Sequence, residues 1–239
     1  GTTISKREAM EGYWKSKAEN RVAHGASQKT NSIYYKDLKK ERNYAVYQKD
    51  WMTKERKKVK EQMANYLNAE GTSRKDKAYQ NMKKEYIELK TSIVDMNTHI
   101  AELNQTLQDT RENVKQWNVN RWERAGAKQD AAINYKLATD KADRQISEKD
   151  YTERIKTDNR QILSLQKLRE EKAEYYDTHF KSMNNEEAQK YLDSIAQIDE
   201  QILNLGTDIE GIKDKIMELR WKPFDDFQGE LDSVINEYQ

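Results

Sequence analysis

Cysteine, proline and glycine are scarce in this chain, which has no cysteine, one proline and 8 glycines among 239 residues. The lack of cysteine excludes disulfides, thiolate metal sites and a cysteine nucleophile. So few prolines and glycines do not provide the turns that a sheet protein of this length needs, so strands are effectively excluded. Because no apolar run of about 18 residues and no hydrophobic signal core is present, we expect this segment neither to span a membrane nor to carry its own export signal.

Apolar residues are also sparse. The chain is 35% hydrophobic and 36% charged, with a mean hydropathy of -1.19, which is low for a compact globule with one large core. A net charge of only +1 together with 14 Tyr and 5 Trp is not typical of a disordered tail. The composition therefore favours thin helices that each bury a narrow apolar strip.

The near-neutral net charge hides an asymmetry along the chain. Residues 1–85 hold 21 Lys and Arg against 11 Asp and Glu, whereas residues 86–239 hold 22 against 31, giving net charges of +10 and -9. The densest basic patch is Lys54–Lys60. Such a patch can contact phosphate, but a solvated helix face, or attraction to the acidic half of a neighbouring chain, explains it as well.

Two stretches carry apolar residues at alternating steps of three and four, and we call them the first and second seams. The first seam, interrupted by the polar Thr110, consists of Tyr79, Met82, Tyr86, Leu89, Ile93, Met96, Ile100, Leu103, Leu107, Val114 and Trp117. The second seam follows Ala188 and consists of Tyr191, Ile195, Ile198, Ile202, Leu205, Ile209, Ile212, Ile216 and Leu219. A period of 3.5 residues predicts long coiled-coil helices, each needing a companion helix from this chain or from another copy.

A break precedes each seam, at Glu70–Ser73 and at Lys181–Glu187, where Asn or Ser can cap the next helix. We therefore predict an elongated all-α fold with two repeated antiparallel helical hairpins; an extended rod with partners from other chains is the alternative. The expected boundaries are a weakly structured segment or the end of a preceding repeat at 1–33, a first repeat at 34–125, a second at 126–222 and the start of a further helix at 223–239. Gly126 is expected to lie in the link between the repeats, and Pro223 to end the second seam helix.

Residues for catalysis are few and dispersed. His24, His99 and His179 lie far apart in the sequence, and no glycine-rich phosphate loop, nucleophile elbow or calcium loop is present. We predict no enzymatic activity, no cofactor and no metal site. Aromatic residues near the ends of the seams, Trp122, Trp221 and Phe224, are candidates for docking a partner or for plugging hairpin ends.

Two segments carry a resemblance to a known family. Residues 212–227 read IKDKIMELRWKPFDDF, and residues 145–151 read QISEKDY. The first is similar to the Arg-Trp-x-Pro-Phe helix end, and the second to the I-S-E-x-x-Y helix start, of coiled-coil repeats in tail tape measure proteins of long-tailed bacteriophages, particularly those of Gram-positive hosts. The first repeat has WNVNRW at residues 117–122, without the Pro-Phe.

The resemblance implies a structural rod that sets tail length during tube assembly. It further implies contacts with tail tube and assembly-chaperone proteins, and a location in the virion tail and, during assembly, in the host cytoplasm. A cellular, cytoplasmic coiled-coil scaffold or the arm of a chromosome-maintenance ATPase is an alternative reading of the same seams. A nucleic-acid-binding module that uses the basic half is a second alternative, although nucleic acid, a small-molecule substrate and a membrane are not expected partners.

Overall fold

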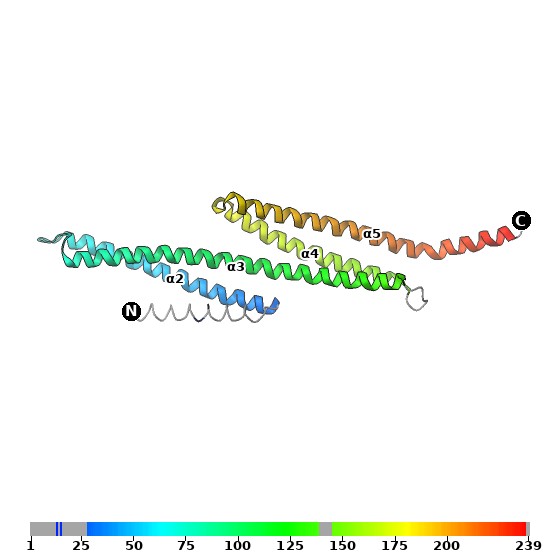
Figure 1. Cartoon of the computed structure of the whole chain (residues 1–239), viewed down its shortest axis with the longest axis horizontal. Helices are drawn as coiled ribbons and strands as arrows, with labels where there is room; N and C mark the ends of the chain where they lie inside the picture. The colour runs from blue at the N-terminus through cyan, green and yellow to red at the C-terminus, as the bar shows by residue number, and fades with distance from the viewer. Residues whose placement is uncertain (1–12, 14, 16–27, 139–144, 238–239) are drawn as a thin grey trace. The chain divides into compact units, whose positions relative to one another are not determined.

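The chain is all-α in the residues that the computed structural model describes, which are 13, 15, 28–138 and 145–237. Its long helices are α2 (Gln28–Leu67), α3 (Lys77–Ala138), α4 (Glu148–His179) and α5 (Asn185–Glu237), with a short 3-10 turn η2 (Phe180–Ser182) before α5 (Figure 1). These ranges contain no strand, so the predicted fold class is confirmed. The expectation for residues 1–33 falls mostly outside the described residues.

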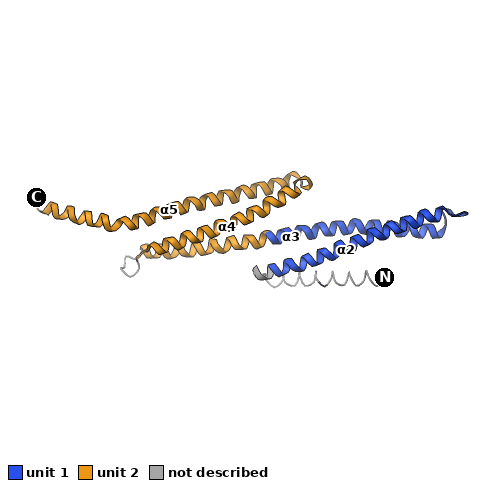
Figure 2. Cartoon of the chain, turned by 180° about the vertical axis from the view of Figure 1, so that it is seen from behind, with its two compact units in different colours: residues 1–111 blue, residues 112–239 orange. Residues whose placement is uncertain are grey.

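The chain divides into two compact units, residues 1–111 and residues 112–239 (Figure 2). The division falls inside α3, so residues 77–111 of this helix belong to unit 1 and residues 112–138 to unit 2. Each unit therefore builds its own core on a different part of the same helix.

Unit 1 is a helical hairpin of α2 and the first part of α3. Its core joins Leu38 and Ala45 of α2 to Leu103 and Leu107 of α3. Beside this core, the Arg111 guanidinium donates hydrogen bonds from Nε and Nη2 to the Tyr35 hydroxyl at 2.9 and 2.6 Å. Since α2 and α3 are joined by a short loop and pack along their lengths, they run antiparallel.

The loop of unit 1 is held by local hydrogen bonds. Gly71 takes a φ of +77°, which side-chain-bearing residues adopt only with strain. The Thr72 hydroxyl donates to the Tyr66 carbonyl at 2.7 Å, and Asp76 Oδ2 accepts from the Tyr66 hydroxyl at 3.1 Å and from the Ser73 amide at 2.6 Å. The predicted break at Glu70–Ser73 is thus an ordered turn between antiparallel helices.

Unit 2 packs three helical segments, with α4 in contact with both residues 112–138 of α3 and α5. Its core draws on all three segments and consists of Val119, Leu165, Leu168, Ile198 and Leu205. Lys115 Nζ lies 2.6 Å from Glu171 Oε2 at one end of the α3–α4 contact, and Lys136 Nζ lies 2.9 Å from Asp150 Oδ2 at the other. These pairs fix an antiparallel α3–α4 register.

The turn between α4 and α5 carries the predicted helix cap. Asn184 Oδ1 accepts a hydrogen bond from the Glu187 amide at 2.8 Å, while Glu187 Oε2 accepts from the Asn184 amide at 3.4 Å, forming a reciprocal capping box. Tyr175 and Tyr191 face each other across this turn, with ring centroids 5.3 Å apart. Tyrosines therefore close this hairpin end.

Two predicted helix ends are wrong. Helix α3 continues through Gly126 to Ala138, where the sequence predicted a link between repeats. Helix α5 likewise continues through Pro223 to Glu237, so residues 223–237 are not a separate helix. A glycine costs a helix only about 1 kcal/mol and is offset here by packing, while a proline kinks an exposed helix without ending it if the flanking turns remain formed. Figure 1 shows α5 changing direction where its colour turns from orange to red.

The glycine at position 126 makes room for an arginine of the neighbouring helix. Arg154 Nε lies 2.7 Å from Asp130 Oδ1 on α3, and Nη1 of the same guanidinium pairs with the fully buried Asp158 one turn along α4. A Cβ atom on Gly126 would lie 3.0 Å from the Arg154 Cζ and Nη1 atoms. A side chain at position 126 would therefore require the Arg154 guanidinium to shift by a few tenths of an ångström.

We predict opposite effects for two glycine-to-alanine substitutions. Gly206→Ala, in a helix position with open space around its Cβ, should raise unfolding free energy by about 0.5–1 kcal/mol because alanine favours helix. Gly126→Ala should instead lower it, since the added methyl group displaces a guanidinium held by two carboxylates. Urea denaturation followed by circular dichroism measures both. Equal gains for the two variants would show that Arg154 moves aside without cost.

Candidate interaction surface

The residues of both predicted seams all lie on partly or fully buried helix faces. In the first seam, Ile93, Leu103 and Leu107 are buried and the others are half-buried; in the second, Ile198, Leu205 and Ile209 are buried. The two seams belong to different units: residues of the first pack with α2 in unit 1, and residues of the second pack with α4 in unit 2. Val114 and Trp117 fall in unit 2, beyond the division of α3.

Helix α2 contains a seam that sequence analysis missed. Leu38, Ala45, Met52 and Val59 are all buried and recur every seven residues. The intervening seam positions are polar, and Glu41 and Gln48 are buried there. A search for apolar residues at alternating steps of three and four overlooks such a helix, but the unbroken seven-residue spacing was a usable signal.

The most distinctive surface of unit 2 lies where the start of α4 meets α5. Residues 145–151 and 212–227, which carry the family resemblance, come together here although they are far apart in sequence. Arg220 of α5 forms a two-pronged ion pair with Glu148 of α4, one prong being Arg220 Nε to Glu148 Oε2 at 3.2 Å. The hydrogen bond that Arg220 donates lowers the pKa of Glu148, and the same hydrogen bond to Glu148 raises the pKa of Arg220.

The first turn of α4 is fixed by Asp150. Its Oδ2 accepts hydrogen bonds from the Ser147 amide at 2.8 Å and from the Ser147 hydroxyl at 3.0 Å, and both carboxylate oxygens lie 2.9 Å from Lys136 Nζ. Partial burial alone would raise the pKa of Asp150, but the Ser147 amide, Lys136 and the Ser147 hydroxyl outweigh it, so the pKa is lowered. The carboxylate thus ties α3 to the N-terminus of α4.

A wide groove follows from this arrangement. Tyr151 lies buried at its floor, where burial first and the nearby Glu218 and Asp150 second raise the pKa of the phenol. Among the other residues that line the groove are Leu137, Ile146, Met217, Trp221 and Pro223. Apolar and charged side chains line the groove together, with Lys136, Asp214 and Lys215 among the charged ones, which suits contact with another helix.

Two of the three candidate docking residues lie side by side and form an exposed aromatic rim: Trp221, which lines the groove, and Phe224. Their rings meet edge to face with centroids 6.0 Å apart, and each residue is more than half exposed. The third, Trp122, is half-buried on α3, with the Arg160 and Arg121 guanidinium carbons 4.9 and 5.1 Å from its ring. Trp122 is therefore held by cation–π contacts within unit 2 and does not share the exposed rim.

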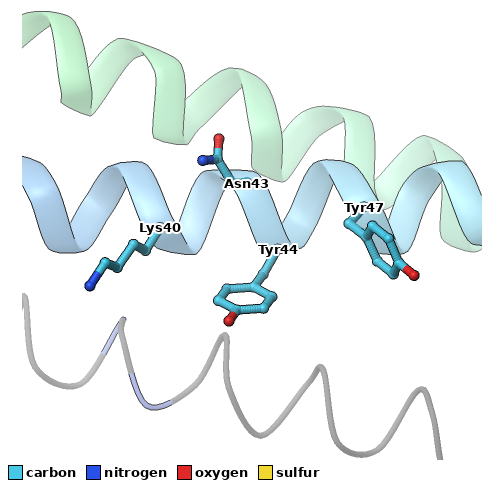
Figure 3. A pocket seen from close by; sticks show the side chains of 4 residues that line it. All are labelled: Lys40, Asn43, Tyr44 and Tyr47. Atoms are coloured by element: carbon cyan, nitrogen blue, oxygen red, sulfur yellow. The ribbon is translucent and has the colours of Figure 1, made fainter.

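A smaller hollow lies on α2 in unit 1, lined by Lys40, Asn43, Tyr44 and Tyr47. Figure 3 shows Lys40 and Tyr44 directed to the side of α2 away from α3. All of its described lining comes from one helix. The two resembling segments meet in unit 2, so we place the candidate surface there.

The described part of the chain holds no cluster of three His, Asp or Glu residues that would bind a metal ion. His99 Nε2 lies 3.8 Å from Glu41 Oε1 in unit 1, and His179 stacks on Tyr175 in unit 2 with centroids 4.2 Å apart. These histidines are separate, and His24 lies outside the described residues. None of the helices, over the described residues, is long and apolar enough to cross a membrane.

Comparison with known proteins identifies no relative. No family model matches the chain, and neither a curated protein nor a solved structure matches it. The resemblance at residues 145–151 and 212–227 therefore stays a prediction.

The Asp158 carboxylate of α4 is fully buried, whereas the Asp150 carboxylate is partly exposed. Burial raises the pKa of Asp158 and dominates over the opposing effect of Arg154, while Asp208 and Asp130 raise it further. Asp158 is fully buried, and its Oδ2 has no hydrogen-bond partner in the structure. The pKa values of the two aspartates of α4 are thus shifted in opposite directions, that of Asp150 downwards and that of Asp158 upwards.

We predict that Asp150→Asn and Asp158→Asn change the pH dependence of stability with opposite signs. The lowered pKa of Asp150 gives stability that is present above the unfolded pKa of about 3.9 and is lost as pH falls, so the deficit of Asp150→Asn should shrink towards about pH 3. The raised pKa of Asp158 gives stability that is present below about 3.9 and is lost as pH rises through the folded value. The advantage of wild type over Asp158→Asn should therefore shrink as pH rises.

Urea midpoints of the three proteins, measured from about pH 3 to 7, provide the comparison. Parallel curves for the two variants would contradict the assigned environments of both carboxylates.

Proposed function

We propose that this chain is a non-catalytic structural segment of a bacteriophage tail, a helical spacer within a tape measure protein. The observation that supports it is the meeting of the two resembling segments. Glu148, from the helix start, pairs with Arg220, from the helix end, and Tyr151 lies beside Glu218. The two segments that resemble the same family thus contact each other in the folded chain. This contact supports the proposal more strongly than either segment does alone.

The hairpins change what such a spacer measures. A straight helix converts residues into length at about 1.5 Å each. In an antiparallel hairpin, two residues, one from each helix, contribute to the same 1.5 Å, so the hairpin contributes about half the length of the same residues in one extended helix. A spacer of this kind therefore sets length through its folded hairpins rather than through the total number of its residues.

The proposed partners follow from this role: tail tube subunits, assembly chaperones and neighbouring helices. The surface that supports such contacts is the α4–α5 groove with its aromatic rim at Trp221 and Phe224. Edge-to-face aromatic pairs at an exposed rim provide large apolar contact area with little loss of side-chain freedom. We propose that the tail proteins bind at this surface and that the chain is located in the virion tail.

A matched deletion tests the spacer role. In unit 1, Leu38 and Leu107 belong to one core and Tyr66 lies near Tyr79, which places residues 46–59 of α2 beside residues 86–99 of α3. Removing both segments deletes two heptads from each helix and preserves the seven-residue seams. We predict that tails assembled with this variant are shorter by about 21 Å per hairpin, measured by electron microscopy.

The matched control duplicates the same two segments, which should lengthen the tail by the same amount. A shortening of about 42 Å would mean that the chain is extended during assembly. Tails of unchanged length in both variants would refute the spacer role, and a failure of the variants to fold would be detected as loss of helicity in the purified chain.

A further inference from the structure

The C-terminal part of α5 carries an exposed apolar face, which we call the C-terminal stripe. It consists of Met217, Trp221, Phe224, Phe227, Leu231, Val234 and Ile235, all 45–59% exposed. Most of these residues follow one another at steps of three or four, so they share one side of the helix. Large apolar residues that gather in this way on a soluble helix mark an interaction surface.

This face is not a continuation of the contact with α4. Helix α4 begins at Glu148, whose partner Arg220 marks the end of the paired part of α5, and residues 221–237 are all exposed. The second seam, continued past Leu219 at the same period, would reach Pro223 and Asp226 rather than the stripe. The stripe is therefore a second apolar face of α5, rotated away from the first and not covered by the described residues of unit 2.

The size of the stripe suits a helix partner. Seven large apolar residues about half exposed correspond to roughly 600–700 Å² per copy, so two stripes together remove roughly 1,200–1,400 Å² from water. That area is at the lower end of stable protein interfaces. A partner must present an apolar face of matching length. The stripe of a second copy does so, because it is apolar over the same length.

Charge along α5 selects the orientation of such a pair. Residues 223–237 contain five acids and no Lys or Arg: Asp225, Asp226, Glu230, Asp232 and Glu237. Residues 213–222 contain four bases against two acids, and Lys213, Lys215 and Lys222 are among the bases. A parallel pair would place all five acids beside their own counterparts. An antiparallel pair in which residue 217 faces residue 235 places Glu230 and Glu237 of each copy beside Lys222 and Lys215 of the other, and only Asp225 and Asp226 lie near their counterparts.

We propose that the C-terminal stripe is a homodimerisation surface, on which two copies of this chain pack their α5 helices antiparallel. In the centred register Met217 faces Ile235 of the partner copy, Trp221 faces Leu231, and the phenylalanines lie near the two-fold axis. The contact is isologous, so it closes at two copies. This proposal is independent of the proposed function, since it uses only the exposed face and charge pattern of α5.

Sedimentation equilibrium of the whole chain tests the stoichiometry. We expect a monomer–dimer equilibrium with a dissociation constant on the order of 10 µM, and at least tenfold weaker association for the double variant Leu231→Ser, Ile235→Ser. The matched control is Leu192→Ser, Leu203→Ser, which changes two exposed leucines of α5 outside the stripe and should leave the equilibrium unchanged. Circular dichroism should show equal helicity in all three proteins, because every substituted residue is exposed in the monomer.

Cysteine cross-linking tests the orientation, since the chain has no native cysteine. An equimolar mixture of Met217→Cys and Ile235→Cys copies should give a mixed disulfide dimer under mild oxidation, whereas each variant alone should give none, because in the antiparallel pair like positions lie too far apart to bond. Disulfide dimers of either single variant would indicate a parallel pair and overturn the proposal. A wild-type chain that stays monomeric, forms trimers, or associates as well after the stripe is changed would also overturn it.

Discussion

Each of the long helices that the structure describes carries a narrow apolar strip, which is stabilised where another helix covers it. The chain is too polar for a thick core, so each contact buries one row of side chains between two helices, as Leu38 and Ala45 do against Leu103 and Leu107. Hydrophobic burial per helix is small under this constraint, and neighbouring helices must keep their registers along many turns. The hairpin turns meet this requirement because they join helices whose seams already face each other.

Charges then fix what the apolar strips leave undetermined. An apolar seam with a seven-residue period would tolerate a shift by one heptad, but buried or bridging charges would not. In unit 2, Arg154 joins Asp130 to the buried Asp158, Lys136 joins the cap of α4, and Arg220 meets Glu148. Burying Asp158 costs free energy, as its raised pKa indicates, and we interpret it as a register determinant rather than as a source of stability.

Helix α5 shows the same constraint when the covering helix is missing. Its second seam is covered as far as Arg220, and a different apolar face begins at Met217 and continues past the kink at Pro223. A helix that changes its apolar face at a proline can serve two partners, one on each side of the kink. The groove, the aromatic rim and the exposed stripe all lie at this change, which concentrates the candidate interactions of unit 2 in one region.

Local sequence signals were sufficient to predict the helical class, both hairpin turns and the two seams, because apolar period, helix caps and scarce turn residues depend only on neighbouring residues. The sequence also named Trp122, Trp221 and Phe224 as candidates for docking a partner or for plugging hairpin ends, and the structure leaves Trp221 and Phe224 more than half exposed. The sequence did not reveal the seam of α2, whose buried Glu41 and Gln48 interrupt the apolar pattern, or the passage of α3 through Gly126. Only the tertiary structure decided these features, because the room that Gly126 provides is needed by Arg154 of another helix, and a buried polar residue is recognised only by what covers it.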